Sequence, residues 1–179
     1  YNMKFTHLLT LDNIRQGVMA SSKKRILEIL SEILTAQTGD DTQVCFESLC
    51  EREKIGCTAL GNGVALPHAR LPHGHKPIAI FLQLANPIEY KAPDNREVDL
   101  LLALFIPADL CSKCGSLLPE IAKKLSNKTL TKQLRAAKSR EEIWDIFSKL
   151  DLQCDENDSS SSKPSTNSVQ QASHTQAAN

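Results

Sequence analysis

Two long apolar runs limit most strongly what this chain can fold into. Residues 78–84 and 98–106 are almost entirely apolar, and Pro107 ends the second run. A strand with one exposed face alternates apolar and polar side chains, whereas a strand covered on both faces is apolar throughout. The two runs therefore predict central strands of a sheet that has helices on both of its faces.

Amphipathic segments around these runs predict the covering helices. A helix that runs to about Gln37 repeats apolar side chains at helical spacing; Ser21 and Ser22 can cap its start, and Gly39 suits its end. Further helices are predicted over residues 41–53, 116–126 and 129–137, and from Ser139 onward. In the second helix, the side chains expected to face inward are Val44, Cys45, Leu49 and Cys50. The predicted fold class is α/β, with a mixed β-sheet sandwiched by helices.

The chain of 179 residues predicts one folded domain over residues 1–152, followed by a tail. Residues 1–8 are interpreted as a leader, and residues 1–20 as holding one short element around Leu8, Leu9, Leu11 and Ile14. Residues 153–179 are rich in Ser and Gln and offer little apolar surface to bury, so they are expected to be disordered.

Charge and composition exclude several classes of function. Lys and Arg total 21, as do Asp and Glu, and aromatic residues make up 4% of the chain, so binding to nucleic acid is not expected. The longest apolar run is far shorter than a membrane span, and the first residues do not resemble a signal peptide. With six irregularly spaced cysteines, the chain is expected to be cytoplasmic, with reduced thiols.

The segment Gly61–Arg70 carries the clearest chemical motif. Gly61 and Gly63 permit positive φ angles and close backbone approach, and backbone N–H groups around such a turn can bind an anion. Pro67 fixes its own φ and holds Leu66 extended, so His68 is presented at a defined angle. Neutral imidazole is a good nucleophile near pH 7, and the motif therefore predicts that His68 accepts a phosphoryl group.

Four runs in this order resemble the mannitol/fructose-type enzyme IIA family of the bacterial phosphotransferase system, and most closely its nitrogen-regulatory type. They are residues 52–68, 94–101, 105–109 and 134–139, and the resemblance extends over about residues 9–150. It implies the fold of that family and a phosphotransferase that carries phosphohistidine, with no cofactor and no metal. The implied partners are a histidine-phosphorylated carrier protein and regulated target proteins, with kinases and potassium transporters as candidate classes.

The resemblance also implies roles for individual residues. His68 corresponds to the phosphorylated histidine, and Arg52 to an arginine near the phosphoryl group, where its planar fork suits phosphate oxygens. Thr58, Gly61 and Gly63 are the further candidates for binding phosphate. Two of these residues have a plain alternative role. Arg52 could be a solvated charge, and Thr58 could cap a turn. A surface role is the preferred interpretation of Arg70.

The main departure is at Cys114, because the resemblance implies that many family members carry a second histidine there; Ser116 also stands where a histidine sometimes occurs. A thiol is a weak hydrogen-bond partner and cannot become an imidazolium, so its presence predicts slower phosphoryl transfer. Cys111 and Cys114 also form a C-x-x-C pair, which together with His68, His73 and His75 raises the alternative of a zinc site. One such pair without a second is weak support for zinc, and no metal is predicted.

Two other functions stay open at this point. One is a protein-binding regulatory module that has the same fold but impaired phosphoryl transfer, as Cys114 would suggest. The other is an enzyme IIA that serves a sugar permease of the fructose or mannitol class made as a separate chain.

Overall fold

The two predicted central strands are the longest in the protein and pair with each other. The computed structural model describes residues 3–155, in which β5 (Ile78–Ile88) and β6 (Val98–Pro107) run antiparallel with Phe81 opposite Leu102. The register of this pair shifts between Gln83 and Ile88, and β5 continues through Pro87 there. Proline is tolerated at such an irregularity because no ladder hydrogen bond is needed from it.

Four shorter strands complete a mixed sheet. β1 (Ile14–Val18) pairs parallel with β5, and β2 (Ala59–Gly61) pairs antiparallel with β3 (Val64–Ala65). β3 and β4 (His68–Leu71) both pair parallel with β6, one after the other along the same side of that strand. The strand order is β1-β5-β6-β3-β2, with β4 attached to β6 beyond β3.

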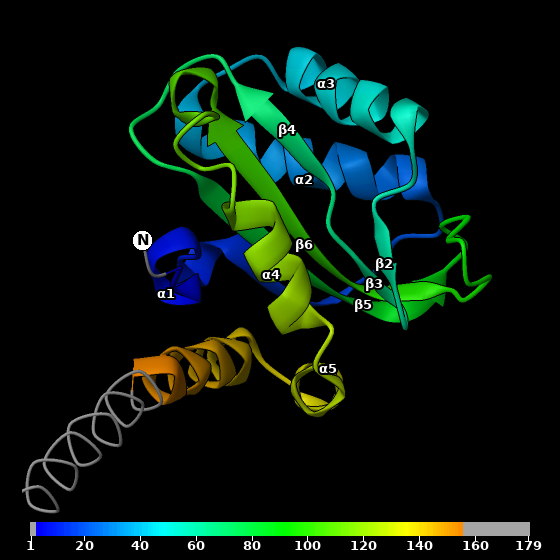
Figure 1. Ribbon diagram of the computed structural model, residues 1–179. Helices are drawn as coiled ribbons and strands as arrows, with labels where there is room; N and C mark the ends of the chain where they lie inside the picture. The colour runs from blue at the N-terminus through cyan, green and yellow to red at the C-terminus, as the bar shows by residue number, and fades with distance from the viewer. Residues whose placement is uncertain (1–2, 156–179) are drawn as a thin grey trace, which may run out of the picture.

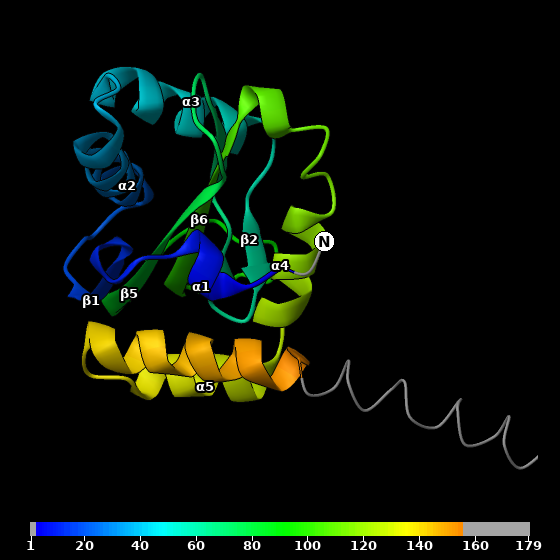
Figure 2. The ribbon, with the colours of Figure 1, turned by 90° about the vertical axis from the view of Figure 1, so that its left-hand side faces the viewer.

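Helices cover both faces of the sheet, as Figures 1 and 2 show. On one face lie α2 (Lys23–Thr38) and α3 (Thr42–Ile55). On the other lie α1 (Phe5–Leu8), α4 (Leu117–Leu125), α5 (Lys128–Ala136) and a last helix that is continuous from residue 140 through residue 155. Short 3₁₀ turns, Leu11–Asn13 (η1) and Ala108–Leu110 (η2), precede β1 and follow β6.

The side chains of β6 divide the core between these two layers. Leu100, Leu102 and Leu104 pack with the α4 side, whereas Leu101 and Ala103 pack with α2 and α3. Successive residues of a strand point to opposite faces, so an uninterrupted apolar run fills both cores at once. This confirms the predicted α/β sandwich with a mixed sheet.

Most predicted helices form close to their expected bounds, with the expected end groups. Ser22 Oγ accepts a hydrogen bond from Arg25 N at 3.1 Å, and Gly39 ends α2 with φ 76°. Val44 is the exception on α3: it was expected to face inward, but its side chain is 61% exposed. Leu49 is fully buried on that helix, and the cysteines are half-buried.

The N-terminal segment is part of the core rather than a leader. Phe5 is fully buried, and its ring centroid lies 4.6 Å from that of Phe147. Asp151 of the last helix accepts hydrogen bonds from the backbone N–H groups of Phe5 and Thr6, both at 2.9 Å. The expectation of one short element over residues 1–20 also missed β1. The expected tail begins at residue 153, and all but its first three residues lie outside the described part of the chain.

Candidate functional site

His68 is the first residue of β4. It lies at the point along β6 where the neighbouring strand changes from β3 to β4. Pro67 separates β3 from β4, although its carbonyl oxygen still accepts a hydrogen bond from Leu104 N at 2.9 Å. β2 pairs with β3 and stops before β4. Figure 1 shows α3 alongside β4, and a side chain of that helix, Arg52, contacts the half-buried imidazole.

The two ring nitrogens of His68 have different partners, and these define its tautomer. Nδ1 lies 2.9 Å from the carbonyl oxygen of Leu66, and Nε2 lies 3.0 Å from Nε of Arg52. A carbonyl oxygen only accepts and a guanidinium only donates, so Nδ1 carries the hydrogen and Nε2 offers its lone pair. Burial lowers the pKa of His68 below its usual value; the Leu66 carbonyl opposes this and the charge of Arg52 adds to it. The imidazole is therefore neutral near pH 7, with Nε2 as its nucleophilic atom.

Arg52 is held in place at both ends of its guanidinium. While Nε donates to His68, Nη1 donates to the carbonyl oxygen of Gly56 at 2.8 Å. Gly56 directly follows α3, so Arg52 also satisfies a carbonyl at the end of its own helix. The remaining donors of the guanidinium have no partner among residues 3–155.

A buried carboxylate, Glu53, anchors the last turn of α3. Lys23 Nζ lies 2.6 Å from Glu53 Oε2, and Tyr90 Oη donates to Glu53 Oε1 at 3.1 Å. The Thr58 hydroxyl also donates to Glu53, and it contacts Tyr90 Oη. Burial, followed by the charge of Glu53, raises the pKa of Tyr90, so its phenol stays protonated as a donor. This network fixes the segment that carries Arg52.

Thr58 belongs to that network and not to the surroundings of His68. Thr58 is 6% exposed, and its hydroxyl donates to Glu53 and contacts Tyr90 Oη. The sequence suggested it as a phosphate ligand because its hydroxyl could donate to a phosphate oxygen. Its partner Tyr90 lies 32 residues farther along the chain, and a sequence pattern does not show that contact.

The imidazole opens into a cavity of about 540 Å³ between α3, β4 and the turn before α4. Its lining combines Ser48, Glu51, Arg52, Ile55, His68, Ala69, Arg70, Ile106, Cys111, Cys114, Gly115 and Leu118. Two arginines and one glutamate give it a net positive charge, which suits an anion at Nε2. Cys114, at the expected position of a second histidine, does share the cavity with His68.

Gly61 and Gly63 are not brought to His68. They form the turn between β2 and β3, and Val64 pairs with Leu100 while His68 pairs with Leu104. Four residues of extended strand separate these positions by about 13 Å. Gly63 has a structural reason of its own: with φ 81°, an added Cβ would lie 2.6 Å from Arg135 Nη2. The backbone of this turn therefore does not face the imidazole.

Arg70 and Cys111 line the cavity although the sequence favoured no role for either at the site. Arg70 follows His68 by two residues on the same strand, and such residues point to the same face. This alternation is the signal in the sequence that could have placed Arg70 beside His68. Cys111 reaches the cavity through the turn after β6, whose path the sequence does not specify.

The residues raised for zinc are not gathered in one place. His73 and His75 are exposed in the loop between β4 and β5 and do not line the His68 cavity. Within residues 3–155, no group of three or more His, Cys, Asp or Glu side chains is arranged to hold a metal ion.

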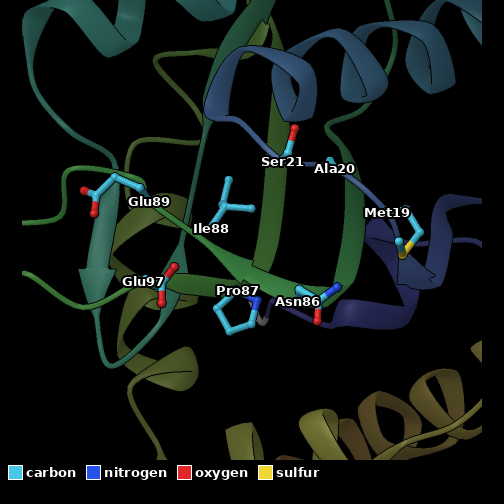
Figure 3. A pocket seen from close by; sticks show the side chains of 8 residues that line it. All are labelled: Met19, Ala20, Ser21, Asn86, Pro87, Ile88, Glu89 and Glu97. Carbon is cyan, nitrogen blue, oxygen red and sulfur yellow. The ribbon is translucent and has the colours of Figure 1, made fainter.

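Another cavity, of about 610 Å³, lies away from His68 beside the end of β5 (Figure 3). Among the described residues that line it, the charged ones are Glu89 and Glu97, which are both acidic. Two carboxylates repel an anionic phosphoryl group. The His68 cavity is therefore the better candidate for phosphoryl chemistry.

The fold and the site together define the class of protein. Residues 7–150 match the family model "Phosphoenolpyruvate-dependent sugar phosphotransferase system, EIIA 2", and the chain belongs to this family. The match extends across all the strands described above, and it includes α3, β4 and the turn before α4.

Within this class, the chain is similar to nitrogen regulatory proteins. It is 48% identical over 151 residues to a nitrogen regulatory protein homolog of Haemophilus influenzae, which covers 81% of this chain and 91% of that one. It is 41% identical over 146 residues to the nitrogen regulatory protein of Escherichia coli K12, covering 81% and 90%. The crystal structure of nitrogen regulatory protein IIA-Ntr from Neisseria meningitidis superposes with a TM-score of 0.74 at 31% identity, over 79% of this chain and 97% of that one. The predicted resemblance is thus confirmed. None of the helices in residues 3–155 is long and apolar enough to cross a membrane.

Proposed function

We propose that this protein is a regulatory phosphocarrier that accepts a phosphoryl group on Nε2 of His68 from a histidine-phosphorylated carrier protein. The observation that carries the proposal is the pairing of the imidazole: Nδ1 donates to Leu66 O, and Nε2 faces Arg52 at the cavity. Membership in the phosphoenolpyruvate-dependent EIIA family supports the same reaction class.

The proposed transfer requires positioning and charge more than covalent help from neighbours. The bond between phosphorus and the donor imidazole breaks as the Nε2 lone pair of His68 forms a new bond to phosphorus. Positive charge develops on the His68 ring, and the Leu66 carbonyl stabilises it through the Nδ1 hydrogen. The arriving phosphoryl displaces Arg52 Nε from Nε2, and the guanidinium is then placed to bind phosphoryl oxygens.

Arg70 adds a second cation at the same cavity, whereas Glu51 repels the phosphoryl group. Thr58, Gly61 and Gly63 are left out of the proposed phosphate ligands, because the first is committed to Glu53 and the glycine turn lies along the strand from His68. The proposed site is therefore His68 with Arg52 and Arg70.

Phosphorylation would regulate target proteins by changing the charge of this surface. A phosphoryl group adds about 1.5 to 2 negative charges at neutral pH, and the surrounding side chains carry a small positive excess. A partner that binds the unmodified surface would then be repelled, or a partner that requires the added negative charge would bind only after phosphorylation. The nitrogen regulatory relatives favour this role over service to a sugar permease, with kinases and potassium transporters as the proposed target classes. The cytoplasm is the proposed compartment, where the carrier protein would be met.

The test is phosphorylation of the purified protein by phosphoenolpyruvate and the general phosphotransferase proteins. We expect an acid-labile mass gain of one phosphoryl group that is lost in His68→Gln and retained in His73→Gln. His73 is a matched control because it is exposed in the loop after β4. Failure of the wild type to gain mass with active donor proteins would overturn the proposal.

Cys114 favours a second candidate, a binding module of the same family in which phosphoryl transfer is impaired. Cys114 lines the same cavity as His68, and the family resemblance implies a second imidazole at its position in many members. A Cys114→His variant that is phosphorylated about 100-fold faster than the wild type would support this candidate. An unchanged rate would show that a second imidazole is dispensable here. Transfer to a fructose- or mannitol-class permease in reconstitution would instead support the sugar-class alternative.

A further inference from the structure

Cys111 and Cys114 lie together in a helical turn that forms one wall of the His68 cavity. The turn follows η2, and its backbone hydrogen bonds run from Cys114 N to Leu110 O and from Leu117 N to Cys114 O, both at 3.0 Å. Cys111 has helical angles of φ −57° and ψ −38°. Both cysteines are free and half-buried, and both line the cavity.

The spacing of the two residues allows a disulfide. Helical geometry places Cα atoms three residues apart at about 5 Å, and disulfides span Cα distances of about 4.4 to 6.8 Å. The Cys111 thiol has a weak competing contact, a hydrogen bond of 3.6 Å to the Pro107 carbonyl oxygen. Rotation of this side chain toward Cys114 therefore loses little.

The other cysteines are less suited to such a reaction. Cys45 and Cys50 are five residues apart on α3, and burial raises the pKa of both thiols, which disfavours the reactive thiolate. The Cys57 thiol donates to the Tyr90 carbonyl oxygen at 3.6 Å, and Cys154 lies on the last helix. Among the cysteines of residues 3–155, Cys111 and Cys114 thus combine a spacing that suits a disulfide with a place at the His68 cavity.

We propose that Cys111 and Cys114 form a reversible dithiol site whose oxidation slows phosphorylation of His68. A low-molecular-weight disulfide such as oxidised glutathione is the oxidant. One cysteine thiolate attacks it, which forms a mixed disulfide and releases one thiol. The second cysteine then displaces the other thiol and closes the Cys111–Cys114 bond. The protein loses two electrons and two protons, and the oxidant becomes two thiols.

The effect on the site follows from the position of the turn. The new bond draws Cys111 Sγ away from Pro107 O and ties the turn that faces the imidazole across the cavity. Displacements of about 1 Å around reacting atoms slow a reaction by up to about 100-fold, so a decrease of about tenfold is expected here. This part of the inference rests on the proposed function, whereas formation of the disulfide does not.

The first experiment maps the disulfide in the full chain. The protein and its His68→Gln variant are equilibrated in mixtures of reduced and oxidised glutathione, the free thiols are blocked, and the linked peptides are identified by mass spectrometry. We expect a Cys111–Cys114 link in both proteins that thiols reverse, that is lost in Cys111→Ser and in Cys114→Ser, and that persists in Cys154→Ser. Mixed glutathione adducts alone, or links between other cysteines, would overturn the dithiol site.

The second experiment compares phosphorylation rates of the oxidised and reduced protein. We expect the oxidised form to be about tenfold slower, recovery of the rate on reduction, and no response to glutathione in a Cys111→Ser/Cys114→Ser double variant. Equal rates for the two forms would overturn control of the site by the disulfide. If the reduced protein takes up no phosphoryl group, the proposed function fails instead, and the peptide map judges the dithiol site by itself.

Discussion

Replacement of Arg52 tests the electrostatic part of the site. Arg52 Nε lies 3.0 Å from His68 Nε2, so a phosphoryl group on that nitrogen would meet the guanidinium at about 4 Å. A unit charge pair at that distance interacts by about 4 kcal/mol near a protein surface and about 1 kcal/mol in bulk water. The open cavity lies between these limits, which gives about 2 to 3 kcal/mol.

This energy corresponds to a rate about 100-fold lower for Arg52→Gln, because each 1.36 kcal/mol of barrier is about tenfold in rate. Arg52→Lys keeps the charge but loses the planar fork, so a smaller loss of about tenfold is expected. The assay is the initial rate of His68 phosphorylation at saturating donor. Lys54→Gln is the matched control, since this exposed residue carries the same charge two positions later on α3.

NMR titration of the His68 ring adds an independent readout. The charge of Arg52 helps to lower the pKa of His68, so Arg52→Gln should raise it, whereas Lys54→Gln should leave it nearly unchanged. A rate for Arg52→Gln equal to that of Lys54→Gln would refute the proposed role of Arg52 in binding the phosphoryl group.

Three further predictions concern stability and pH. Glu53→Gln removes a carboxylate whose side chain is 7% exposed and which accepts several hydrogen bonds, so we expect a loss of about 2–3 kcal/mol in urea unfolding, against less than about 0.5 kcal/mol for exposed Glu47→Gln. Because folding lowers the pKa of His68, the neutral imidazole contributes fully to the free energy of unfolding above the pKa of the unfolded chain, near 6.5. This contribution should decline as the pH falls toward the lower folded pKa, and the pH dependence of unfolding of His68→Gln should lack that decline. Gly63→Ala places a Cβ 2.6 Å from a guanidinium nitrogen, whereas Gly39→Ala meets nothing within 4 Å at a similar φ, so the first should lower stability by about 1–3 kcal/mol more than the second; equal losses would refute the steric argument.

The layers of the fold could be predicted because each depends on a short-range repeat. The apolar run of β6 alternates between the two cores, and α2 has both its Ser22 cap and its Gly39 end. β1 was missed because it has five residues, of which Ile14 alone is buried, and its pairing partner lies more than sixty residues away in β5. Val44 was misplaced because α3 packs against α2 and β4 and still leaves a wide exposed face, on which Val44 lies.

The site was predictable only where contacts follow from the motif itself. Pro67 sets the position of His68. The family resemblance placed Arg52 near His68, and in the structure the two side chains share a direct hydrogen bond. Gly61 and Gly63 were predicted to belong to the same site because they are near His68 in sequence, but an extended chain separates neighbours by about 3.3 Å per residue. Thr58 was misjudged because its partners come from other elements.

The most direct test of the central claim is to determine which ring nitrogen of His68 carries the phosphoryl group. Two-dimensional ¹H–¹⁵N NMR of the phosphorylated, ¹⁵N-labelled protein distinguishes the two positions by the coupling of phosphorus to the ring nitrogens. Because Nδ1 is committed to the Leu66 carbonyl and Nε2 faces the cavity, we expect phosphorus on Nε2. Phosphorus on Nδ1, or on any other residue, would contradict it.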